Sequence, residues 1–258
     1  MSLNRSDNPE AYGHHLLQCA IMIGSNMLMT GAEIHRVEDT VKRICLAYGA
    51  EEAEVFSITY TIIVTVSSKD FGILTQTKRI SGFAYNLNIM NALNALSRKI
   101  CEEHPSFESV EADVQNILTL ETYSSGWIIF AYALISAAFT VFFGGALQDA
   151  LVSGCIGVAM RLVELPLRKL QINRFVVVCL CSATAGFLAI TATNLGLGLS
   201  AEKISIGNIM VLVPGLLLTN SIRDLFADNM ISGFVRICEV VLLSIVIAFG
   251  FAIAHASF

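Results

Sequence analysis

Long apolar stretches in the second half of the chain limit its fold more than any other feature. Four are clear, at about 126–143, 175–195, 204–222 and 233–254. A helix needs about 20 mostly apolar residues to cross the hydrocarbon core of a membrane. A weaker fifth stretch, about 145–165, contains Asp149, Arg161 and Glu164, but its middle carries no charge. We therefore predict five membrane spans.

Charged residues make up only 14% of the chain, and they are unevenly distributed. Residues 1–125 hold 9 Lys/Arg and 15 Asp/Glu, whereas residues 126–258 hold 7 and 6. An average soluble domain carries about 25% charged residues. The shortage excludes a disordered chain and a nucleic-acid binder driven by basic charge, so we expect no nucleic acid among its partners.

Lysine and arginine in the short loops predict the orientation, because cytoplasmic loops are enriched in both. The segment between the second and third spans carries four of them: Arg161, Arg168, Lys169 and Arg174. The segment between the fourth and fifth carries Arg223 and Arg236, and the opposite loops carry only Lys203. We therefore predict a multi-pass protein of the plasma (inner) membrane with a cytoplasmic N-terminal domain and an outside C-terminus.

The first half has the shorter periodicities of a small α+β domain. Apolar residues at helical spacing predict helices at about 11–29, 34–48, 84–101 and, after Pro105, up to about 121. Alternating β-branched residues predict strands at 54–58, 59–66 and 73–80. Thr30-Gly-Ala-Glu33 fits a capping box at the start of the second helix. The predicted fold class is α-helical membrane protein, with a cytoplasmic α+β domain (1–124) followed by a five-helix transmembrane bundle (125–258).

Nothing in the sequence indicates a metal, a cofactor or a catalytic centre. The seven cysteines are scattered without a C-x-x-C pair, which favours reduced thiols over disulfides or zinc. His35 and Asp39 lie one helical turn apart and could reach one metal ion, but a solvated helix face explains them better. No nucleophile elbow, P-loop or H-E-x-x-H motif occurs, so we expect a protein that is not an enzyme.

A proline–glycine pair interrupts the fourth predicted span. Pro214 lacks an N–H and Gly215 loosens the same turn, so carbonyls near residue 210 lose their partners. Transporters form substrate sites from such broken helices and convergent polar groups. The alternative is a simple proline kink with an interfacial Arg–Asp pair. The predicted substrate-binding residues are Asn208, Pro214, Gly215, Thr219, Asn220, Arg223, Asp224 and, at the start of the second span, Asp149.

Two segments resemble the threonine/serine exporter (ThrE-like) family. The run from Gly31 to Thr40 resembles the family's G-A-E-x-x-R-V-E-D-T segment, and Val213 to Asp224, followed by Ser232-Gly233, resembles its proline–glycine membrane motif. Fused family members carry about five more spans, so this chain is similar to the longer subunit of the split form. Relatives of that form are linked to export of threonine and serine or of dicarboxylates such as succinate. The resemblance implies a second, smaller five-span subunit and an oligomer.

We therefore expect an export component for a small amino acid or a dicarboxylate, embedded in membrane lipid. Arg223 would attract the substrate carboxylate, Asn220 and Thr219 would bond its polar groups, and Asp149 and Asp224 are the carboxylates for proton coupling. The alternative is a membrane-anchored ligand sensor or scaffold whose cytoplasmic domain carries the function. An intramembrane enzyme is disfavoured, because His255 is the only histidine in the second half.

Overall fold

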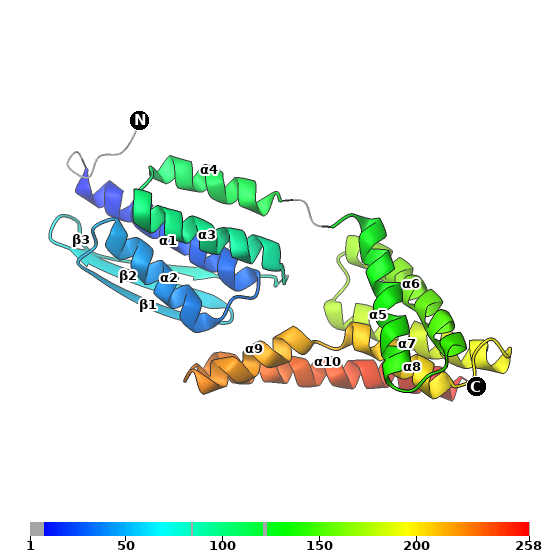
Figure 1. Cartoon of the computed structure of the whole chain (residues 1–258). Coiled ribbons are helices and arrows are strands. Elements are labelled where there is room, and N and C mark those ends of the chain that lie inside the picture. Colours follow the sequence, from blue (N-terminus) through cyan, green and yellow to red (C-terminus); the bar gives the residue numbers. More distant parts are fainter. Residues whose placement is uncertain (1–7, 84, 121–122, 258) are drawn as a thin grey trace. The chain divides into compact units, whose positions relative to one another are not determined.

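The computed structural model describes residues 8–83, 85–120 and 123–257, and it is mostly helical with one small sheet (Figure 1). The chain divides into two compact units, which are described separately. The first unit combines Met1–Glu121 with Leu217–Ile237, and the second combines Thr122–Leu216 with Cys238–Phe258. A segment from within the apolar half therefore belongs to the same unit as the N-terminal α+β elements.

The first unit is a three-stranded antiparallel sheet with helices packed on it. Its N-terminal elements are α1 (Pro9–Met29), α2 (Ile34–Ala47), β1 (Glu52–Ile58), β2 (Thr61–Ser68), β3 (Gly72–Arg79), α3 (Leu87–Glu103) and α4 (Phe107–Leu118). The strand order is β1-β2-β3. The helices α1 and α2 contact the sheet, and α3 and α4 pack on them in turn (Figure 1).

Sequence periodicity accounts for the core of this unit. In β2 every second residue is buried, and Ile62, Val64 and Val66 have no exposed surface. Burial of each such side chain contributes about 1.5–3 kcal/mol to the free energy of folding, relative to leaving it exposed. On the facing helix α1, Gly24 allows close approach, because a Cβ there would lie 2.5 Å from Val41 Cγ2. The expected helices and strands are confirmed, with ends shifted by up to three residues where they are described.

The expected capping box is wrong. Thr30 ends α1 instead of starting α2, and its hydroxyl donates to the carbonyls of Asn26 (2.9 Å) and Met27 (3.0 Å). Glu33 is the N-cap residue of α2, yet its side chain makes no capping hydrogen bond. The N-terminus of α2 must therefore find its acceptor elsewhere.

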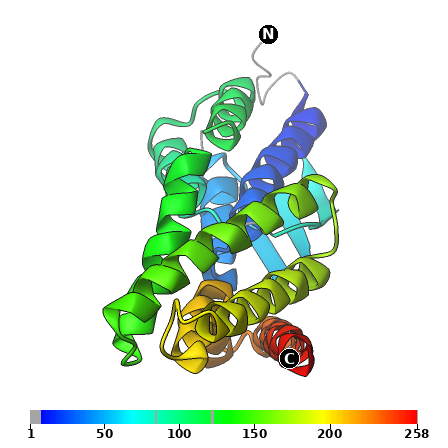
Figure 2. The same ribbon diagram turned by 90° about the vertical axis from the view of Figure 1, so that its right-hand side faces the viewer.

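The secondary structure described for the second unit is entirely helical. The helices are α5 (Ser125–Phe142), α6 (Leu147–Lys169), α7 (Arg174–Asn194), α8 (Ala201–Leu212) and the C-terminal part of α10 (Met230–Ala256). A short turn after α5 returns the chain along it as α6, shown in green in Figure 2. Glycines bring α7 and α10 together, since a Cβ on Gly250 would lie 1.9 Å from Ser182 Oγ. Large apolar side chains remain exposed, including Phe142 at 77%, as expected of a lipid-facing surface.

Among the described residues, four helices are long and apolar enough to cross a membrane: α5, α6, α7 and α10. They match four of the predicted spans to within a few residues. The stretch predicted at 204–222 is not one helix but the pair α8 and α9 (Gly215–Phe226), which gives a fifth crossing if the pair forms one span. Val213 is extended between them, so the break predicted from Pro214 is confirmed.

The buried thiols of the first unit give a test of this fold. Burial raises the pKa of Cys19 and of Cys45 to about 12. Because the thiolate is the reactive form, we expect neither cysteine to react with N-ethylmaleimide at pH 7.5 until the protein is unfolded. Unfolded thiols titrate near pH 8.5, so this contribution to stability is complete below that pH and is lost as the pH rises toward about 12.

Peptide mass spectrometry of labelled protein would measure the reaction. The partly exposed Cys101 serves as the internal reference. Labelling of Cys45 in the folded protein as fast as Cys101 would contradict the packing described.

Candidate functional site

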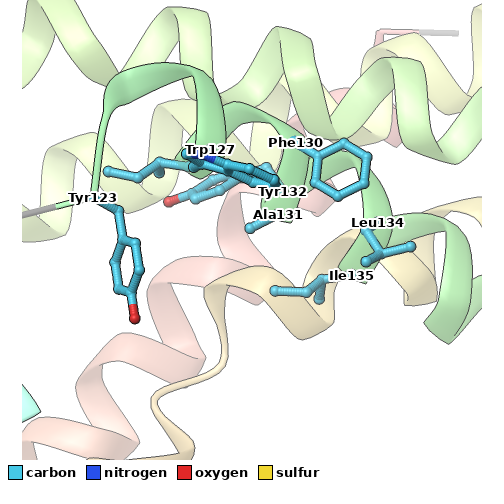
Figure 3. Close-up of a pocket in the computed structure, with 8 residues that line it drawn as sticks. Tyr123, Trp127, Phe130, Ala131, Tyr132, Leu134 and Ile135 are labelled. Atoms are coloured by element: carbon cyan, nitrogen blue, oxygen red, sulfur yellow. The ribbon is translucent and has the colours of Figure 1, made fainter.

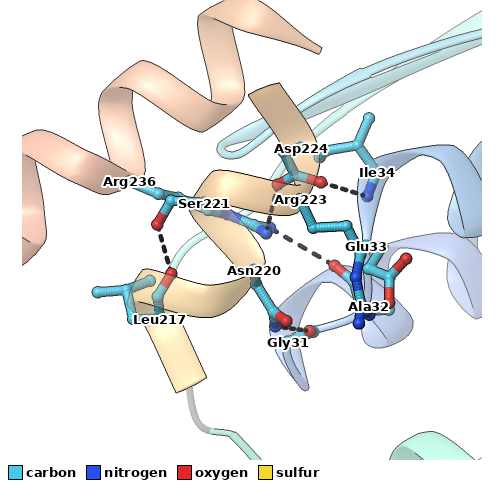
Figure 4. Close-up of polar contacts among 10 residues, drawn as sticks. All are labelled: Gly31, Ala32, Glu33, Ile34, Leu217, Asn220, Ser221, Arg223, Asp224 and Arg236. Atoms are coloured by element: carbon cyan, nitrogen blue, oxygen red, sulfur yellow. Dashed lines mark hydrogen bonds and ion pairs between the residues drawn. The ribbon is translucent and has the colours of Figure 1, made fainter. Parts of the chain in front are cut away.

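Three predicted site residues lie together on α9, where they face the loop between α1 and α2 (Figure 4). The side-chain amide of Asn220 donates to the carbonyl of Gly31 (3.1 Å). The guanidinium of Arg223 forms an ion pair with the carboxylate of Glu33. The two motifs that were recognised separately in the sequence are therefore in direct contact. We call this group the loop–hairpin cluster: Gly31, Ala32, Glu33, Ile34, Asn220, Arg223, Asp224 and Arg236.

Asp224 is the centre of the cluster. Its Oδ2 accepts from Arg236 at 2.7 Å, and its Oδ1 accepts from the backbone N–H of Ile34 at 3.4 Å. Ile34 is the first residue of α2, so Asp224 supplies the acceptor that this helix lacks locally. A carboxylate at a helix N-terminus is also favoured by the helix dipole.

The Asp224–Arg236 ion pair is buried, with side chains only 1% and 2% exposed. A second nitrogen of Arg236 reaches the carbonyl of Ala32 at 3.5 Å. A buried pair is stable only when further hydrogen bonds satisfy both partners, and the backbone groups of residues 32 and 34 provide them. The loop and the α9–α10 hairpin therefore hold each other in place.

Gly31 cannot be replaced without moving its neighbours. Its φ is +95°, and a Cβ there would lie 2.3 Å from the ring of Tyr85. Only glycine tolerates this combination of backbone angle and close approach. The conformation leaves its carbonyl oxygen as the acceptor for Asn220.

A close turn joins α9 to α10. The hydroxyl of Ser221 donates to the carbonyl of Leu217, and a Cβ on Gly233 would lie 2.9 Å from the carbonyl oxygen of Ser221. The N–H of Asn229 donates to the carbonyl of Asp224 (2.9 Å). Gly233 of the family-like motif is thus explained by close packing within the hairpin.

Arg223 is the accessible charge of the cluster. Its side chain is 57% exposed, compared with 23% for Glu33. The two arginines and two carboxylates of the cluster balance each other. The cluster is therefore already neutral. An incoming anion that binds Arg223 would add negative charge unless it takes the place of the Glu33 carboxylate.

The remaining predicted residues lie elsewhere. Pro214 and Gly215 stand at the break between α8 and α9, and Thr219 precedes Asn220 on α9. Asn208 lies on α8 in the second unit, where its amide nitrogen donates to Ser153 Oγ and to the carbonyl of Ile204, each at 2.9 Å. It has no exposed surface.

Asp149 lies in the first turn of α6 in the second unit and is 1% exposed. Its carboxylate accepts three backbone N–H groups, from Ala146 (3.0 Å), Leu199 (2.6 Å) and Ser200 (3.1 Å). It therefore closes the N-terminus of its own helix and fixes the loop before α8.

Sequence reasoning missed two buried charges. Arg236 was read as a cytoplasmic loop charge, although its position inside the fifth apolar stretch was a signal of burial. Glu164, 5% exposed, accepts from the hydroxyl of Tyr132 (2.6 Å), from Arg161 (2.7 Å) and from Arg168 (2.6 Å). The spacing of these arginines, three and four residues away on α6, could have indicated the network.

A metal site finds no support within the described ranges, where no group of three or more histidine, cysteine, aspartate or glutamate side chains could hold an ion. His35 is exposed, and Asp39 pairs with Arg43 at 2.9 Å on the surface of α2.

A hollow of about 600 Å³ lies along α5 (Figure 3). Its lining is aromatic and aliphatic, and consists of Tyr123, Trp127, Ile128, Phe130, Ala131, Tyr132, Leu134 and Ile135. Such a lining suits an acyl chain or an apolar helix better than a charged solute.

Comparisons with known proteins agree with these motifs. The family model described as "Putative threonine/serine exporter" matches residues 18–257. The chain is 26% identical over 245 residues to "Probable succinate transporter subunit YjjP" of Klebsiella aerogenes, covering 92% of this chain and 90% of that protein. It is 21% identical over 183 residues to "Pheromone-regulated membrane protein 10" of Kluyveromyces lactis, covering 67% of this chain but 19% of that protein. No solved structure matches.

The two ion pairs of the cluster should contribute differently to the free energy of unfolding. Asp224→Ala leaves the buried Arg236 unpaired and should lower the free energy of unfolding by about 3–5 kcal/mol. Arg223→Ala removes an exposed pair and should cost about 0–1 kcal/mol. Thermal unfolding of the purified variants would measure both. Equal losses would show that the buried pair is not the main stabilising contact.

Proposed function

This chain belongs to the putative threonine/serine exporter family, and on that premise we propose that it is the larger subunit of a split exporter in the plasma (inner) membrane. The proposed substrates are small solutes that carry a carboxylate, either threonine and serine or a dicarboxylate such as succinate. The family match and the membrane-spanning helices support a multi-pass transporter, and the similar protein named as a succinate transporter subunit supports the dicarboxylate.

The observation that carries the proposal is the exposed guanidinium of Arg223, held by Glu33 beside a broken helix pair. Arginine binds carboxylates through two parallel N–H donors. We propose that the substrate carboxylate exchanges with Glu33 on Arg223. Asn220 and Thr219, on the same helix, would bond the other polar groups of the substrate.

For proton coupling, Asp224 is a better candidate than Asp149. Protonation of Asp224 would weaken its ion pair with Arg236 and its contact with the N-terminus of α2. Protonation of Asp149 would weaken only backbone contacts around a loop. Protonation of Asp224 would therefore loosen the attachment of α9 to the α+β elements. A contact that can be made or broken in this way suits alternating access, which needs two conformations of the protein.

We propose a second, smaller five-span subunit as the partner. The similar Klebsiella protein is named as a subunit, and four or five crossings leave a transporter without a facing half. Export by cells that contain both subunits, and not by cells that contain either alone, would support this assembly. Initial efflux rates of labelled threonine, serine and succinate would identify the substrate.

A ligand sensor is the alternative, and one feature favours it. A polar hollow of about 430 Å³ lies in the first unit between α2 and α3. Three arginines line it, Arg36, Arg43 and Arg98, against two carboxylates, Asp39 and Glu102, so one positive charge is left over. This hollow suits a small anion and is distinct from the loop–hairpin cluster.

One pair of variants separates the two functions. Arg223→Gln should lower the initial efflux rate about tenfold or more, because one charged hydrogen-bond donor to the substrate is lost. Arg43→Gln removes another surface ion pair, the more exposed one with Asp39, and should leave efflux unchanged. Membrane content of each variant must match that of the wild type. Normal efflux by Arg223→Gln together with loss in Arg43→Gln would favour the sensor.

A further inference from the structure

Polar side chains from three helices meet inside the second unit, where α5, α6 and α8 pack together. The hydroxyl of Thr140 and the amide of Asn208 both reach Ser153 Oγ, at 2.7 and 2.9 Å. The Ser153 hydroxyl in turn donates to the carbonyl of Ser136 (3.1 Å). We call this group the bundle cluster: Ser136, Thr140, Ser153, Ser205 and Asn208. All five side chains are buried.

The orientation of the Asn208 amide is fixed by its neighbours. Its nitrogen donates to the carbonyl of Ile204, a group that can only accept. The nitrogen must therefore stay on that side, and Oδ1 points away from it. Within the described part of the chain this oxygen has no hydrogen-bond partner, although the residue is completely buried.

Two more side-chain oxygens of the bundle cluster are buried without a hydrogen-bond partner in the part of the chain that the structure describes. The hydroxyl oxygens of Ser136 and Ser205 are buried and, among the residues described, have no partner. Ser205 lies one turn before Asn208 on α8, and the Ser136 carbonyl is already part of the cluster. Burying unpaired polar atoms in a membrane-spanning unit is unfavourable, which indicates that a ligand completes them.

The space around the cluster limits the size of that ligand. A Cβ on Gly207 would lie 2.0 Å from Thr140 Oγ1, and a Cβ on Gly157 would lie 2.6 Å from Ser136 Oγ. The three helix backbones are therefore too close for an amino acid or a dicarboxylate. A single ion or a single water molecule is the largest ligand that suits such packing.

The chemistry of the cluster selects the ion. Every potential ligand atom is an uncharged oxygen, and the cluster contains no carboxylate, thiol or imidazole. Hard oxygen ligands without negative charge suit a monovalent cation, whereas calcium and magnesium sites use carboxylates. Half-helix ends beside such groups bind Na⁺ in transporters, and α8 ends four residues after Asn208.

We propose that the bundle cluster binds one sodium ion, through Asn208 Oδ1 and the hydroxyl oxygens of Ser136 and Ser205. Binding itself does not depend on the proposed export function; only a role of the bound ion in transport, beside the proton coupling proposed for Asp224, rests on that function. The site is separate from the loop–hairpin cluster assigned to the substrate.

The test is ion-dependent stability of the purified full chain in detergent. Thermal unfolding is measured over a range of NaCl concentrations, with choline chloride keeping the ionic strength constant, and again with KCl. Sodium should raise the melting temperature with saturation, because a ligand that binds only the folded state stabilises it, and potassium should have a smaller effect. Identical melting temperatures in the three salts would show that the cluster holds water only and would overturn the proposal.

Variants of the cluster residues test whether the sodium effect on the melting temperature arises at this site. Ser136→Ala and Ser205→Ala should each raise the half-saturating sodium concentration about tenfold, and Asn208→Ala should abolish the sodium effect. Ser182→Ala is the matched control, since this serine of α7 is equally buried but its hydroxyl donates to Cys179. If Asn208→Ala does not fold, the two serine variants decide. A sodium response in them equal to that of Ser182→Ala would overturn the proposed site.

If sodium raises the melting temperature but Arg223→Gln exports normally, the proposed substrate site fails. If sodium has no effect on the melting temperature but Arg223→Gln loses efflux, the proposed ion site fails. The binding measurement uses the chain without substrate, and the efflux measurement needs no assumption about the ion.

Discussion

The N-terminus of α2 depends on a carboxylate that lies 190 residues away in the sequence. Asp224 accepts the first N–H of the helix and forms a buried ion pair with Arg236. Each contact explains why the other is stable: the arginine neutralises the carboxylate, and the backbone of residues 32 and 34 satisfies the remaining polar atoms of the pair. The α+β elements and the α9–α10 hairpin are therefore one unit, although Thr122–Leu216 separate their sequences.

This arrangement divides the predicted site residues by role. Arg223 is exposed and paired with Glu33, the carboxylate that we propose a substrate replaces, whereas Asp224 is enclosed and holds the hairpin. Asp149 fixes a loop with three backbone contacts, and Asn208 belongs to a neutral polar cluster among packed helices. We therefore propose separate roles for these residues: a substrate site at Arg223, a buried ion pair at Asp224 and a cation site at Asn208.

The comparison of prediction with structure is informative at particular residues. The break at Pro214 was predictable because a missing N–H is a local property. The capping box at Thr30 failed because local pattern cannot reveal that Arg223 takes the Glu33 carboxylate and that Asp224 caps the helix from a distance. Arg236 was assigned to a loop because the count of lysines and arginines that predicts orientation treats every arginine near the end of a span alike. Whether such an arginine is buried depends on an ion-pair partner elsewhere in the chain.

The sequence by itself determined the apolar helices, the three alternating strands, the broken helix pair and the membership of a transporter family, because each follows from composition, periodicity or motif. Only the tertiary structure decided that the two motifs touch, that Asp224 and Arg236 are buried together, and that Asn208 Oδ1 has no hydrogen-bond partner among the described residues. These facts depend on which distant side chains meet, and on the room that glycines such as Gly31 and Gly207 leave between backbones. No short segment of sequence contains that information.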